Sequence, residues 1–413
     1  AMAHNGNLTN YTQLKEELRR EHINCNSDSD LEVIMGVFAA TLSAQSANQC
    51  LLLDNDHDGK IFFEHICRAA EAVFDRCRGG YSVVGMIADR GMVIFRDPHG
   101  IRPLVWGNRI NADGKTDYIF SSENTMYYPL HFRYQGNIEP GEVVFINMAG
   151  VIQRRRLRRD AFTPCAFEYV YLARPDALMN NVSVYKARLR MGENLGKKWL
   201  RTYSDLLPDI VIPVPFSSNT AALAMAQQLG VRYSEGLYKN QFIGRTFIMP
   251  GQEKRIKSVL HKLSPQEIEI RGKTVMLLDD SIVRGTTSKE VVRLVRDAGA
   301  KKVYFVTACP PVVNPDFYGI DIPTKSELIA ADRTVEQIRD YIGADILLYQ
   351  DIPDLVEAIT RHGDHGIDRL SMPCLDGWYV TGDVTEEMLE KMETVRSTDR
   401  DDKIAETTAE MLV

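Results

Sequence analysis

The chain has 413 residues, which is too long for one ordinary hydrophobic core and predicts at least two domains. Its 44% hydrophobic and 25% charged residues exclude a fibrous or disordered chain. A net charge of −7 without a basic stripe argues against nucleic acid as a partner, and no apolar stretch approaches the ~20 residues that span a membrane. The seven cysteines include no C-x-x-C pair, which favours reduced thiols in the cytoplasm.

The first 160 residues mix predicted helices and strands. Helical spacing of apolar residues covers residues 12–21, 31–44 and 63–74. Two strand patterns, 81–88 and 92–95, flank a short turn and predict a hairpin. Further strands of the same antiparallel layer are predicted at 120–123 and 142–147. The basic run 154–159 is predicted to be an exposed linker.

After about residue 165 short apolar runs alternate with helical segments. This alternation predicts an α/β fold with a mostly parallel sheet covered by helices on both faces. The runs are 211–215, 275–278, 303–307 and 346–348, and the helical segments are 220–229, 289–298 and 334–342. One amphipathic helix is predicted after Thr385, packed against the body through Met388, Leu389, Met392 and Val395, and the end beyond 398 is expected to fray.

Residues 274–288 form the most informative stretch of the chain. An apolar run ends in Asp279 and Asp280, and a turn rich in hydroxyl groups then opens a helix. Carboxylates at a strand end can bind ribose hydroxyls or Mg²⁺, and a helix N-terminus attracts phosphate. The stretch therefore predicts a site for a phosphorylated sugar. A capped helix start behind a surface pair of acids would use the same residue types, but the preceding strand and Gly285 favour the sugar site.

A second polar turn, 216–220, follows the apolar run 211–215. Because the carboxyl ends of parallel strands meet at one edge of a sheet, the two turns could hold the two ends of a sugar that carries phosphates at separate positions. Successive side chains of a regular strand point to opposite faces. Asp279 and Asp280 are therefore expected to diverge, one toward the sugar hydroxyls and one toward magnesium or the attacking group.

Several motifs carry a family resemblance. Residues 275–288 resemble the phosphoribosyl-diphosphate (PRPP) motif of type I phosphoribosyltransferases, and nearly the whole chain is similar to the amidophosphoribosyltransferase family. The resemblance rests on 167–176, 244–251 and 318–321 in the second half and on 4–10, 27–30 and 95–103 in the first. It implies a partial glutamine amidotransferase domain of the N-terminal-nucleophile class with αββα layers (1–160), a type I phosphoribosyltransferase domain (165–375) and a C-terminal helical tail (376–413).

The family resemblance implies a pentosyl-transferring glycosyltransferase that catalyses the first committed step of de novo purine biosynthesis. Ammonia released from glutamine replaces the pyrophosphate of PRPP, which gives 5-phosphoribosylamine, glutamate and pyrophosphate. The implied cofactor is Mg²⁺, with Ser217, Asp279 and Asp280 as its oxygen ligands. The implied PRPP-binding residues are Lys239, Arg245, Lys262, Asp279, Asp280, Arg284, Gly285, Thr286, Thr287 and Ser288.

The basic segment 242–263 carries five lysines and arginines and resembles the start of the family's active-site loop. We expect it to close over the pyrophosphate and to become ordered with substrate. An ordinary solvated basic segment is the alternative. Leu260 and His261 replace basic residues of the family pattern, and Phe216 replaces the usual acidic residue before Ser217.

For the glutaminase half, the resemblance implies an oxyanion hole at Asn5 and Gly6, and Asp28 as the residue that holds the amino group of glutamine. The family's nucleophile is a cysteine at the start of the mature chain. This sequence starts Ala1-Met2-Ala3-His4, so we expect it to begin partway through the domain and to use free ammonia rather than hydrolyse glutamine. A truncated sequence and a natural protein without glutaminase activity both remain open.

Some members of the family hold an iron–sulfur cluster on four cysteines. Cys165 and Cys374 lie near two matching positions, but Asp316 and Gly377 occupy the other two, so no cluster is predicted. The resemblance also suggests a cytoplasmic homotetramer inhibited by purine nucleotides, with an internal ammonia passage.

Two other functions remain as alternatives. One is a phosphoribosyltransferase that acts on a nitrogen base. The other is a non-catalytic regulator that senses PRPP or nucleotides.

Overall fold

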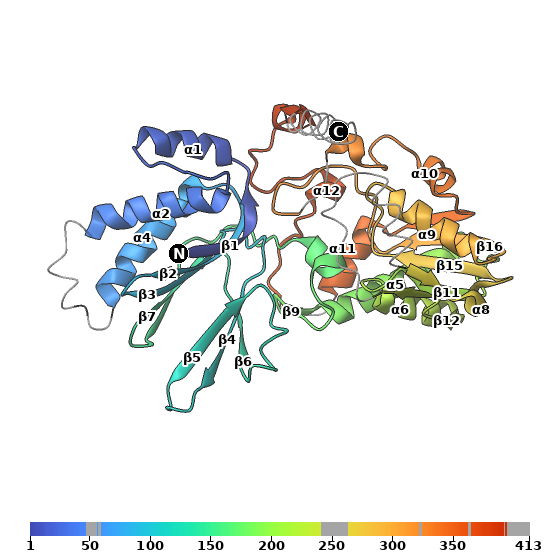
Figure 1. Ribbon diagram of the computed structural model, residues 1–413, viewed down its shortest axis with the longest axis horizontal. Helices are drawn as coiled ribbons and strands as arrows, with labels where there is room; N and C mark the ends of the chain where they lie inside the picture. Colours follow the sequence, from blue (N-terminus) through green and yellow to red (C-terminus); the bar gives the residue numbers. More distant parts are fainter. Residues whose placement is uncertain are drawn as a thin grey trace, which may run out of the picture.

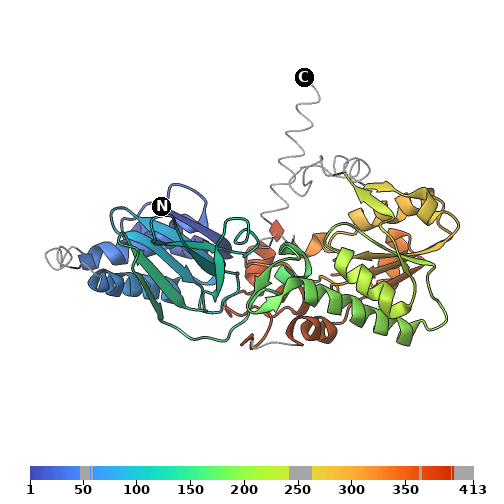
Figure 2. The ribbon, with the colours of Figure 1, turned by 90° about the horizontal axis from the view of Figure 1, so that it is seen from below.

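The computed structural model describes residues 1–46, 56, 59–240, 263–320, 322, 324–361, 365–391, 393 and 394. Two units built around β-sheets lie side by side along the long axis of the molecule (Figure 1). The turned view shows the same two units, with helices and loops from the second half of the chain between the two sheets (Figure 2).

The N-terminal unit contains a five-stranded antiparallel sheet. Its strand order is β1 (Met2–Leu8), β2 (Gly79–Ile87), β3 (Gly91–Arg96), β7 (Glu142–Asn147) and β8 (Ile152–Arg156). The predicted hairpin is confirmed as the pair β2–β3.

Helices and a second sheet cover the two faces of this sheet. Inward side chains such as Val83, Phe95 and Phe145 pack against α1 (Tyr11–Arg20), α2 (Asp30–Ser46) and α4 (Lys60–Arg76). On the other face, Ile94 and Val144 pack against a three-stranded sheet. Its order is β5 (Thr116–Ser121), β4 (Val105–Ile110) and β6 (Arg133–Asn137). The unit therefore has helix, sheet and sheet layers in succession (Figure 1).

Two expectations for this unit were wrong. The strand predicted at 120–123 lies at 116–121 and belongs to the second sheet, because alternation of apolar residues predicts a strand but not its sheet. The first half of the basic run is not a linker, since residues 152–156 form the edge strand β8, whereas 157–159 lie outside any helix or strand. Its arginines pair with neighbours: Arg154 lies 2.8 Å from Glu142, and Arg155 lies 2.6 Å from Glu64 of α4. An edge strand tolerates such charges because one of its sides faces solvent.

The C-terminal unit contains a five-stranded, fully parallel sheet. Its strand order is β12 (Arg232–Tyr233), β11 (Ile210–Pro213), β15 (Thr274–Asp279), β16 (Lys302–Thr307) and β17 (Ile346–Tyr349). Residues 275–278 of the central strand are fully buried, as expected for a sheet covered on both faces.

Helices cover both faces of the parallel sheet (Figure 1). On one face, core residues join the sheet to α5 (Val184–Thr202), α6 (Asn219–Leu229) and α11 (Ile352–Thr360). On the other face they join it to α8 (Glu267–Ile270), α9 (Thr286–Asp297) and α10 (Val335–Ile342). The predicted α/β arrangement is therefore confirmed.

Short elements complete the C-terminal unit: the π-helix η1 (Glu168–Leu172), the ribbon of β9 (Leu178–Met179) and β10 (Val182–Ser183), the ribbon of β13 (Leu237–Lys239) and β14 (Leu263–Pro265), the 3-10 helix η2 (Lys325–Glu327) and α12 (Pro373–Asp376). Residues 386–391, 393 and 394 are helical, as predicted, and Met388 and Leu389 are half-buried. Met392 and Val395 fall outside what the structure describes. Within the described residues, no helix is both long and apolar enough to cross a membrane.

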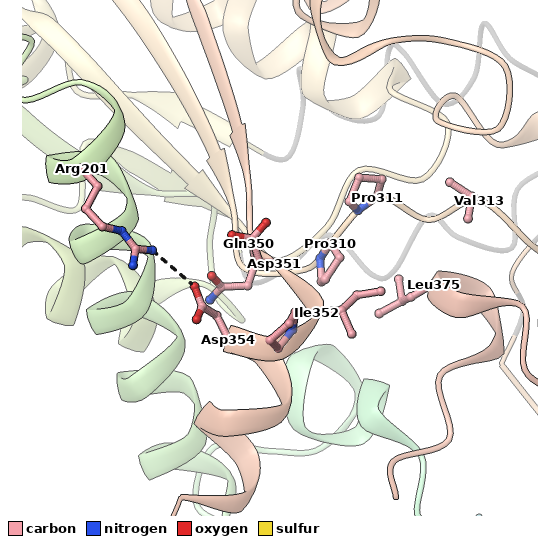
Figure 3. A pocket seen from close by; sticks show the side chains of 10 residues that line it. Arg201, Pro310, Pro311, Val313, Gln350, Asp351, Ile352, Asp354 and Leu375 are labelled. Carbon is pink, nitrogen blue, oxygen red and sulfur yellow. Dashed lines mark ion pairs between the residues drawn. The ribbon is translucent and has the colours of Figure 1, made fainter.

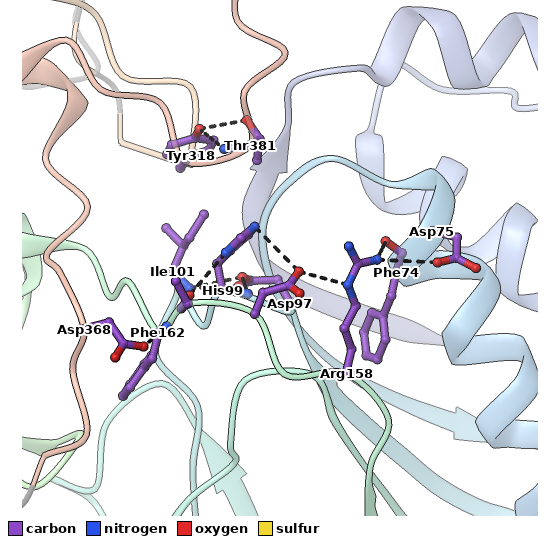
Figure 4. Close-up of polar contacts among 12 residues, drawn as sticks. Phe74, Asp75, Asp97, His99, Ile101, Arg158, Phe162, Tyr318, Asp368 and Thr381 are labelled. Carbon is purple, nitrogen blue, oxygen red and sulfur yellow. Dashed lines mark hydrogen bonds and ion pairs between the residues drawn. The ribbon is translucent and has the colours of Figure 1, made fainter.

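The connection between the units is fixed by polar contacts (Figure 4). The backbone N–H of Phe162 donates to Asp368 at 2.8 Å, which ties the connecting segment to the C-terminal unit. Arg158 reaches back to the end of α4, where its guanidinium donates to the carbonyl of Phe74 at 3.2 Å and pairs with Asp75 at 3.4 Å.

Candidate active site and the junction between the units

At one position in the parallel sheet, two neighbouring strands are connected onward to strands on opposite sides of that position. From β11 the chain proceeds to β12 on one side, whereas β15 lies on the other side and leads on to β16 and β17. Open α/β sheets bind ligands outside the carboxyl ends of the strands at such a switch point. The two predicted polar turns follow β11 and β15, so both lie at this position.

The structure brings Ser217, Asp279 and Asp280 together. The Ser217 hydroxyl donates a short hydrogen bond to the Asp280 carboxylate across the two strand ends. Ser281 donates to the other oxygen of Asp280 at 2.9 Å. The backbone N–H of Asp280 donates to the Asp279 carboxylate, also at 2.9 Å. The expected divergence of the two acids stays a prediction.

Burial governs the ionisation of this acid pair. The side chain of Asp279 is 8% exposed. Loss of hydration, followed by repulsion from Asp280, raises the pKa of Asp279 well above its usual value. Loss of hydration also raises the pKa of Asp280, although the Ser217 hydroxyl opposes this. A cation or a set of hydroxyl donors at the site would therefore stabilise the ionised pair.

The turn after the acid pair leads into the N-terminus of α9. Gly285 has φ +74°, and a Cβ at this position would lie 2.5 Å from Cδ1 of Ile329. Gly285 has no side chain to cap the first-turn N–H groups, which therefore stay open to an anion. Thr287 is exposed and Thr286 is half-buried, whereas Ser288 is 3% exposed.

The side chain of Arg284 is engaged elsewhere. Its guanidinium lies 2.7 Å from the Glu327 carboxylate of η2. In this arrangement Arg284 can offer its backbone, but not its side chain, to a phosphate in the turn.

Besides Arg284, Lys239 is a basic residue predicted to bind PRPP that the structure describes. It lies at the end of β13. Its ammonium lies 5.3 Å from the ring centroid of Phe216, the residue before Ser217. Arg245, Lys262, Leu260 and His261 lie outside the described residues, as does the rest of the predicted loop except Leu263, which begins β14.

In the N-terminal unit, Asn5 and Gly6 lie on β1. The Asn5 carbonyl oxygen accepts from Nε of Arg102 at 3.2 Å, and its amide nitrogen donates to the Ser122 hydroxyl at 3.1 Å. Gly6 has φ +146°, and a Cβ there would lie 1.9 Å from the carbonyl oxygen of Gly80 on β2. Only glycine fits at this position.

Asp28 and Asp30 occupy different surroundings. The Asp28 side chain is 97% exposed and pairs with Lys15 at 3.0 Å. Asp30 instead contacts β1, because it accepts from the backbone N–H of Leu8 at 3.1 Å and lies 3.1 Å from His4. Asp30 lies in the motif 27–30, but the family resemblance indicated Asp28 and not Asp30. The role predicted for Asp28 stays a prediction.

Buried contacts join β1 and its neighbours to the C-terminal unit. Arg102, which holds Asn5, also forms an ion pair of 2.7 Å with Glu168 at the start of η1, and both side chains are buried. A Cβ at Gly319 would lie 2.9 Å from Cα of Gly6, so backbone from the two units is in direct contact. The sequence motifs contained both Arg102 and Glu168 but gave no sign that they pair.

A second junction contact involves Arg96 and Asn180. The fully buried Arg96 guanidinium donates to the side-chain oxygen of Asn180 at 3.3 Å, and the Asn180 amide donates to the Tyr169 hydroxyl at 3.0 Å. The two units are therefore joined through several buried polar side chains.

The cysteines considered for an iron–sulfur cluster are buried. Burial raises the pKa of the Cys165 thiol to about 12 and that of Cys374 well above its usual range. The Asp316 carboxylate is near enough to both thiols to raise their pKa further. Among the described residues, no group of three or more His, Cys, Asp and Glu side chains is arranged to hold a metal ion. The expectation that no cluster is bound stays a prediction.

A pocket of about 650 Å³ opens beyond β16 and β17 (Figure 3). Arg201 and Asp354 form an ion pair of 4.0 Å at one side of it, and Gln350 and Asp351 line it at the strand end. None of the residues predicted to bind PRPP lines this pocket.

Comparison with known proteins agrees with this arrangement. A family model described as a glutamine amidotransferase domain matches residues 1–127, and one described as a phosphoribosyl transferase domain matches residues 186–316. The chain is 48% identical to amidophosphoribosyltransferase from Pseudomonas aeruginosa over 400 residues, which cover 96% of this chain and 77% of that protein. It is 43% identical to the Escherichia coli protein of the same name over 402 residues, with the same shares. The yeast protein, from Saccharomyces cerevisiae, is 39% identical over 410 residues, 97% of this chain and 78% of its own length.

A solved structure is also similar. The glutamine PRPP amidotransferase of B. subtilis, complexed with ADP and GMP, superimposes with a TM-score of 0.77 at 34% identity. The match covers 94% of this chain and 78% of that chain.

The parallel sheet with its acid pair at the switch point, joined to a layered amidotransferase unit, defines a phosphoribosyltransferase fused to a glutamine amidotransferase domain. The chain belongs to the amidophosphoribosyltransferase family.

Proposed function

We propose that the chain transfers the phosphoribosyl group of PRPP to ammonia, the transferase half of the amidophosphoribosyltransferase reaction in purine biosynthesis. The observation that carries this proposal is the pairing of Ser217 with Asp280 across two strand ends at the switch point. That pairing gathers hydroxyl and carboxylate oxygens beside the open N-terminus of α9. A sugar that carries phosphate on one side and pyrophosphate on the other needs this combination.

In the proposed complex the turn at 284–288 holds the 5′-phosphate. The first-turn N–H groups of α9 and the Thr286 and Thr287 hydroxyls are its donors, and the helix dipole favours the negative charge. Asp279 and Asp280 accept hydrogen bonds from the ribose hydroxyls. The Lys239 ammonium faces the pyrophosphate and stabilises it as it departs.

The donor set at the switch point fits Mg²⁺. Proteins bind this ion through one or two carboxylates and substrate phosphates rather than through a complete protein cage, and they use hard oxygen ligands. Asp279, Asp280 and Ser217 supply such oxygens, and burial raises the pKa of both acids, which makes a cation a favourable partner. When bound, the ion would neutralise charge that builds up on the leaving pyrophosphate.

The reaction replaces one bond at the anomeric carbon. A C–N bond forms from the lone pair of ammonia, the C–O bond to pyrophosphate breaks with its electron pair, and the nitrogen loses one proton. The anomeric carbon passes through an oxocarbenium-like state, which water could also attack. The residues at the switch point therefore have to orient the sugar and limit the access of water.

The N-terminal unit is proposed to supply the ammonia from glutamine, with Asn5 and Gly6 as the oxyanion hole and Asp28 at the amino group of glutamine. The orientation of the Asn5 side-chain amide supports its role as a hydrogen-bond donor in the oxyanion hole. Arg102 can only donate hydrogen bonds, so the Asn5 side-chain oxygen is the atom that faces Arg102. We propose the limits 1–160, 165–375 and 376–413 for the two domains and the tail.

Regulation and assembly are proposed from the family. Purine nucleotides are proposed as inhibitors, and the related B. subtilis structure was solved with ADP and GMP. A homotetramer is proposed as the assembly. The cytoplasm is proposed as the compartment, because the six cysteines in the described part of the chain are all free thiols.

The central experiment incubates the protein with PRPP, magnesium and ammonium salt and measures pyrophosphate. We expect release that depends on ammonium, because free ammonia replaces the glutaminase half. Release that depends instead on a nitrogen base would show a base phosphoribosyltransferase, and PRPP binding without release would show a sensor. Either result would overturn the proposal.

A double variant, Asp279→Asn with Asp280→Asn, tests the site itself. Loss of both charges should weaken PRPP–magnesium binding at least about tenfold, since each removed charge-assisted contact contributes about 1.5–3 kcal/mol. Asp113→Asn, an exposed acid in the β4–β5 turn, is the control and should bind normally. Undiminished affinity of the double variant for PRPP would place the sugar elsewhere.

A further inference from the structure

Phe216 is an unusual residue for the place it occupies. It lies in the polar turn after β11, next to Ser217, and its side chain is 52% exposed. The hydroxyl of its neighbour is hydrogen-bonded to Asp280, so Phe216 directly precedes a residue that contacts the acid pair. Burial does not explain the position of this half-exposed apolar ring, but a specific contact does.

That contact is with Lys239 of β13. The ammonium lies 5.3 Å from the Phe216 ring centroid, within the range of about 6 Å over which a cation is attracted to an aromatic face. No carboxylate in the described part of the chain lies within ion-pair distance of this ammonium. Lys198 shows the contrasting case, since its ammonium lies 2.7 Å from the Asp351 carboxylate.

The two kinds of partner have different electrostatic consequences. A carboxylate would hold the lysine but cancel its charge, and it would place a third acid beside Asp279 and Asp280, which already repel each other. An aromatic ring attracts the ammonium through its quadrupole and carries no net charge. The lysine is therefore held in place with its full positive charge available to an anion.

We infer that Phe216 is a positioning residue for Lys239: its ring holds the ammonium, which pairs with no carboxylate of the described residues, at the rim of the acid pair, where it receives the diphosphate of the substrate. This inference rests on the proposed function and deepens it. It assigns the aromatic residue a role in the affinity for a diphosphate rather than in the chemistry at the anomeric carbon.

Variants at position 216 separate this role from a packing role. Phe216→Leu keeps an apolar side chain without the quadrupole, and we expect about a three- to tenfold rise in the KM for PRPP with little change in kcat. Phe216→Trp keeps an aromatic face and should keep the KM within about twofold of the wild type. Phe216→Asp should raise the KM further than Phe216→Leu, because the carboxylate neutralises Lys239 and repels the diphosphate.

Tyr238 provides a matched control. It is the neighbouring residue of Lys239, it is aromatic, and it is exposed to the same degree, at 53%. Tyr238→Leu should leave the KM for PRPP unchanged.

A double-mutant cycle with Lys239→Met gives the decisive result. If Phe216 acts through Lys239, Phe216→Leu has no further effect on the KM once the ammonium is gone. An equal rise of the KM in both backgrounds would overturn the inference, as would an unchanged KM in the single Phe216→Leu variant. Thermal melting of each variant confirms that it is folded.

Failure of the proposed function can be distinguished from failure of the inference about Phe216. The affinity of the wild type and the variants for magnesium pyrophosphate is measured by calorimetry, which requires no turnover. If the wild type releases no pyrophosphate with ammonium, the proposed function fails. The inference about Phe216 then stands or falls on whether Phe216→Leu weakens pyrophosphate binding only when Lys239 is present.

Discussion

At the scale of single residues, Asp279 and Asp280 serve binding at the expense of stability. Asp279 is buried and Asp280 is half-buried, and loss of hydration raises the pKa of each. In an unfolded chain each would ionise near its ordinary pKa. The ionised form is therefore disfavoured in the folded protein, and the free energy of unfolding falls as the pH rises from the ordinary to the raised pKa.

Asp279→Asn should accordingly stabilise the unliganded protein at neutral pH. The amide has a similar shape and no charge, so at pH 7–8 we expect a gain of roughly 1–3 kcal/mol. The gain should shrink as the pH falls toward the ordinary pKa, because the wild-type carboxyl is then protonated as well. Scanning calorimetry from pH 4 to 8 measures this difference, and Asp113→Asn should show none. A gain that does not change with pH would contradict the electrostatic account.

At the scale of elements, the start of α9 depends on one backbone conformation. Gly285 adopts φ +74° and lies against Ile329, so the chain can turn sharply from β15 into the helix. This turn connects the acid pair to the first turn of the helix, whose N–H groups have no side-chain cap. The same helix is followed at its other end by Gly299, with φ +92°, where a Cβ would lie 3.3 Å from Cγ of the Arg271 side chain.

Gly285→Ala should therefore damage binding as well as stability. The new Cβ would lie 2.5 Å from Ile329 and the φ angle is unfavourable, so we expect a loss of about 1–3 kcal/mol of stability. The displaced first turn should also weaken PRPP binding by at least about tenfold, or 1.4 kcal/mol. Gly299→Ala is the matched control. We expect it to lower the stability of the protein and to leave the affinity for PRPP unchanged. Denaturant unfolding and calorimetric titration measure the two effects, and equal losses of affinity in both variants would refute a role for the turn.

At the scale of the whole molecule, the junction between the units rests on buried charges. Arg102 contacts Asn5 on one side and Glu168 on the other. Burial raises the pKa of Glu168 even though the Arg102 guanidinium opposes this, so attraction within the pair does not fully offset its loss of hydration. Such a pair stabilises little as a whole, but removal of one partner leaves a buried charge without compensation.

Arg102→Met should destabilise the protein by about 3–5 kcal/mol, whereas the double variant Arg102→Met with Glu168→Gln should recover part of this loss. Denaturant unfolding of the four proteins in this cycle gives the coupling energy. The surface pair Arg339–Asp340 is the control and should show a coupling below about 1 kcal/mol. Additive losses for Arg102 and Glu168 would show that their contact does not join the units.

Much of the fold was predictable because its signals are local. The run Val275–Leu278 ends at two acids and a glycine-led turn, and each of these features follows from neighbouring residues. The hairpin β2–β3 and the helices of the parallel unit were likewise predictable from periodicity. In contrast, the pattern around Phe120 indicates a strand but does not indicate the sheet to which it belongs. The charges of 154–156 favoured a linker, although these residues form part of an edge strand.

The sequence by itself determined the two-unit organisation, the acid pair at a strand end and the family, because apolar periodicity and short motifs act over a few residues. Only the tertiary structure decided that Ser217 reaches Asp280, that Phe216 holds Lys239 and that Arg102 joins Asn5 to Glu168. These partners are far apart in the chain, and their contacts depend on strand order and on the packing of one unit against the other. No local pattern encodes that arrangement, since it arises from the burial of the whole core.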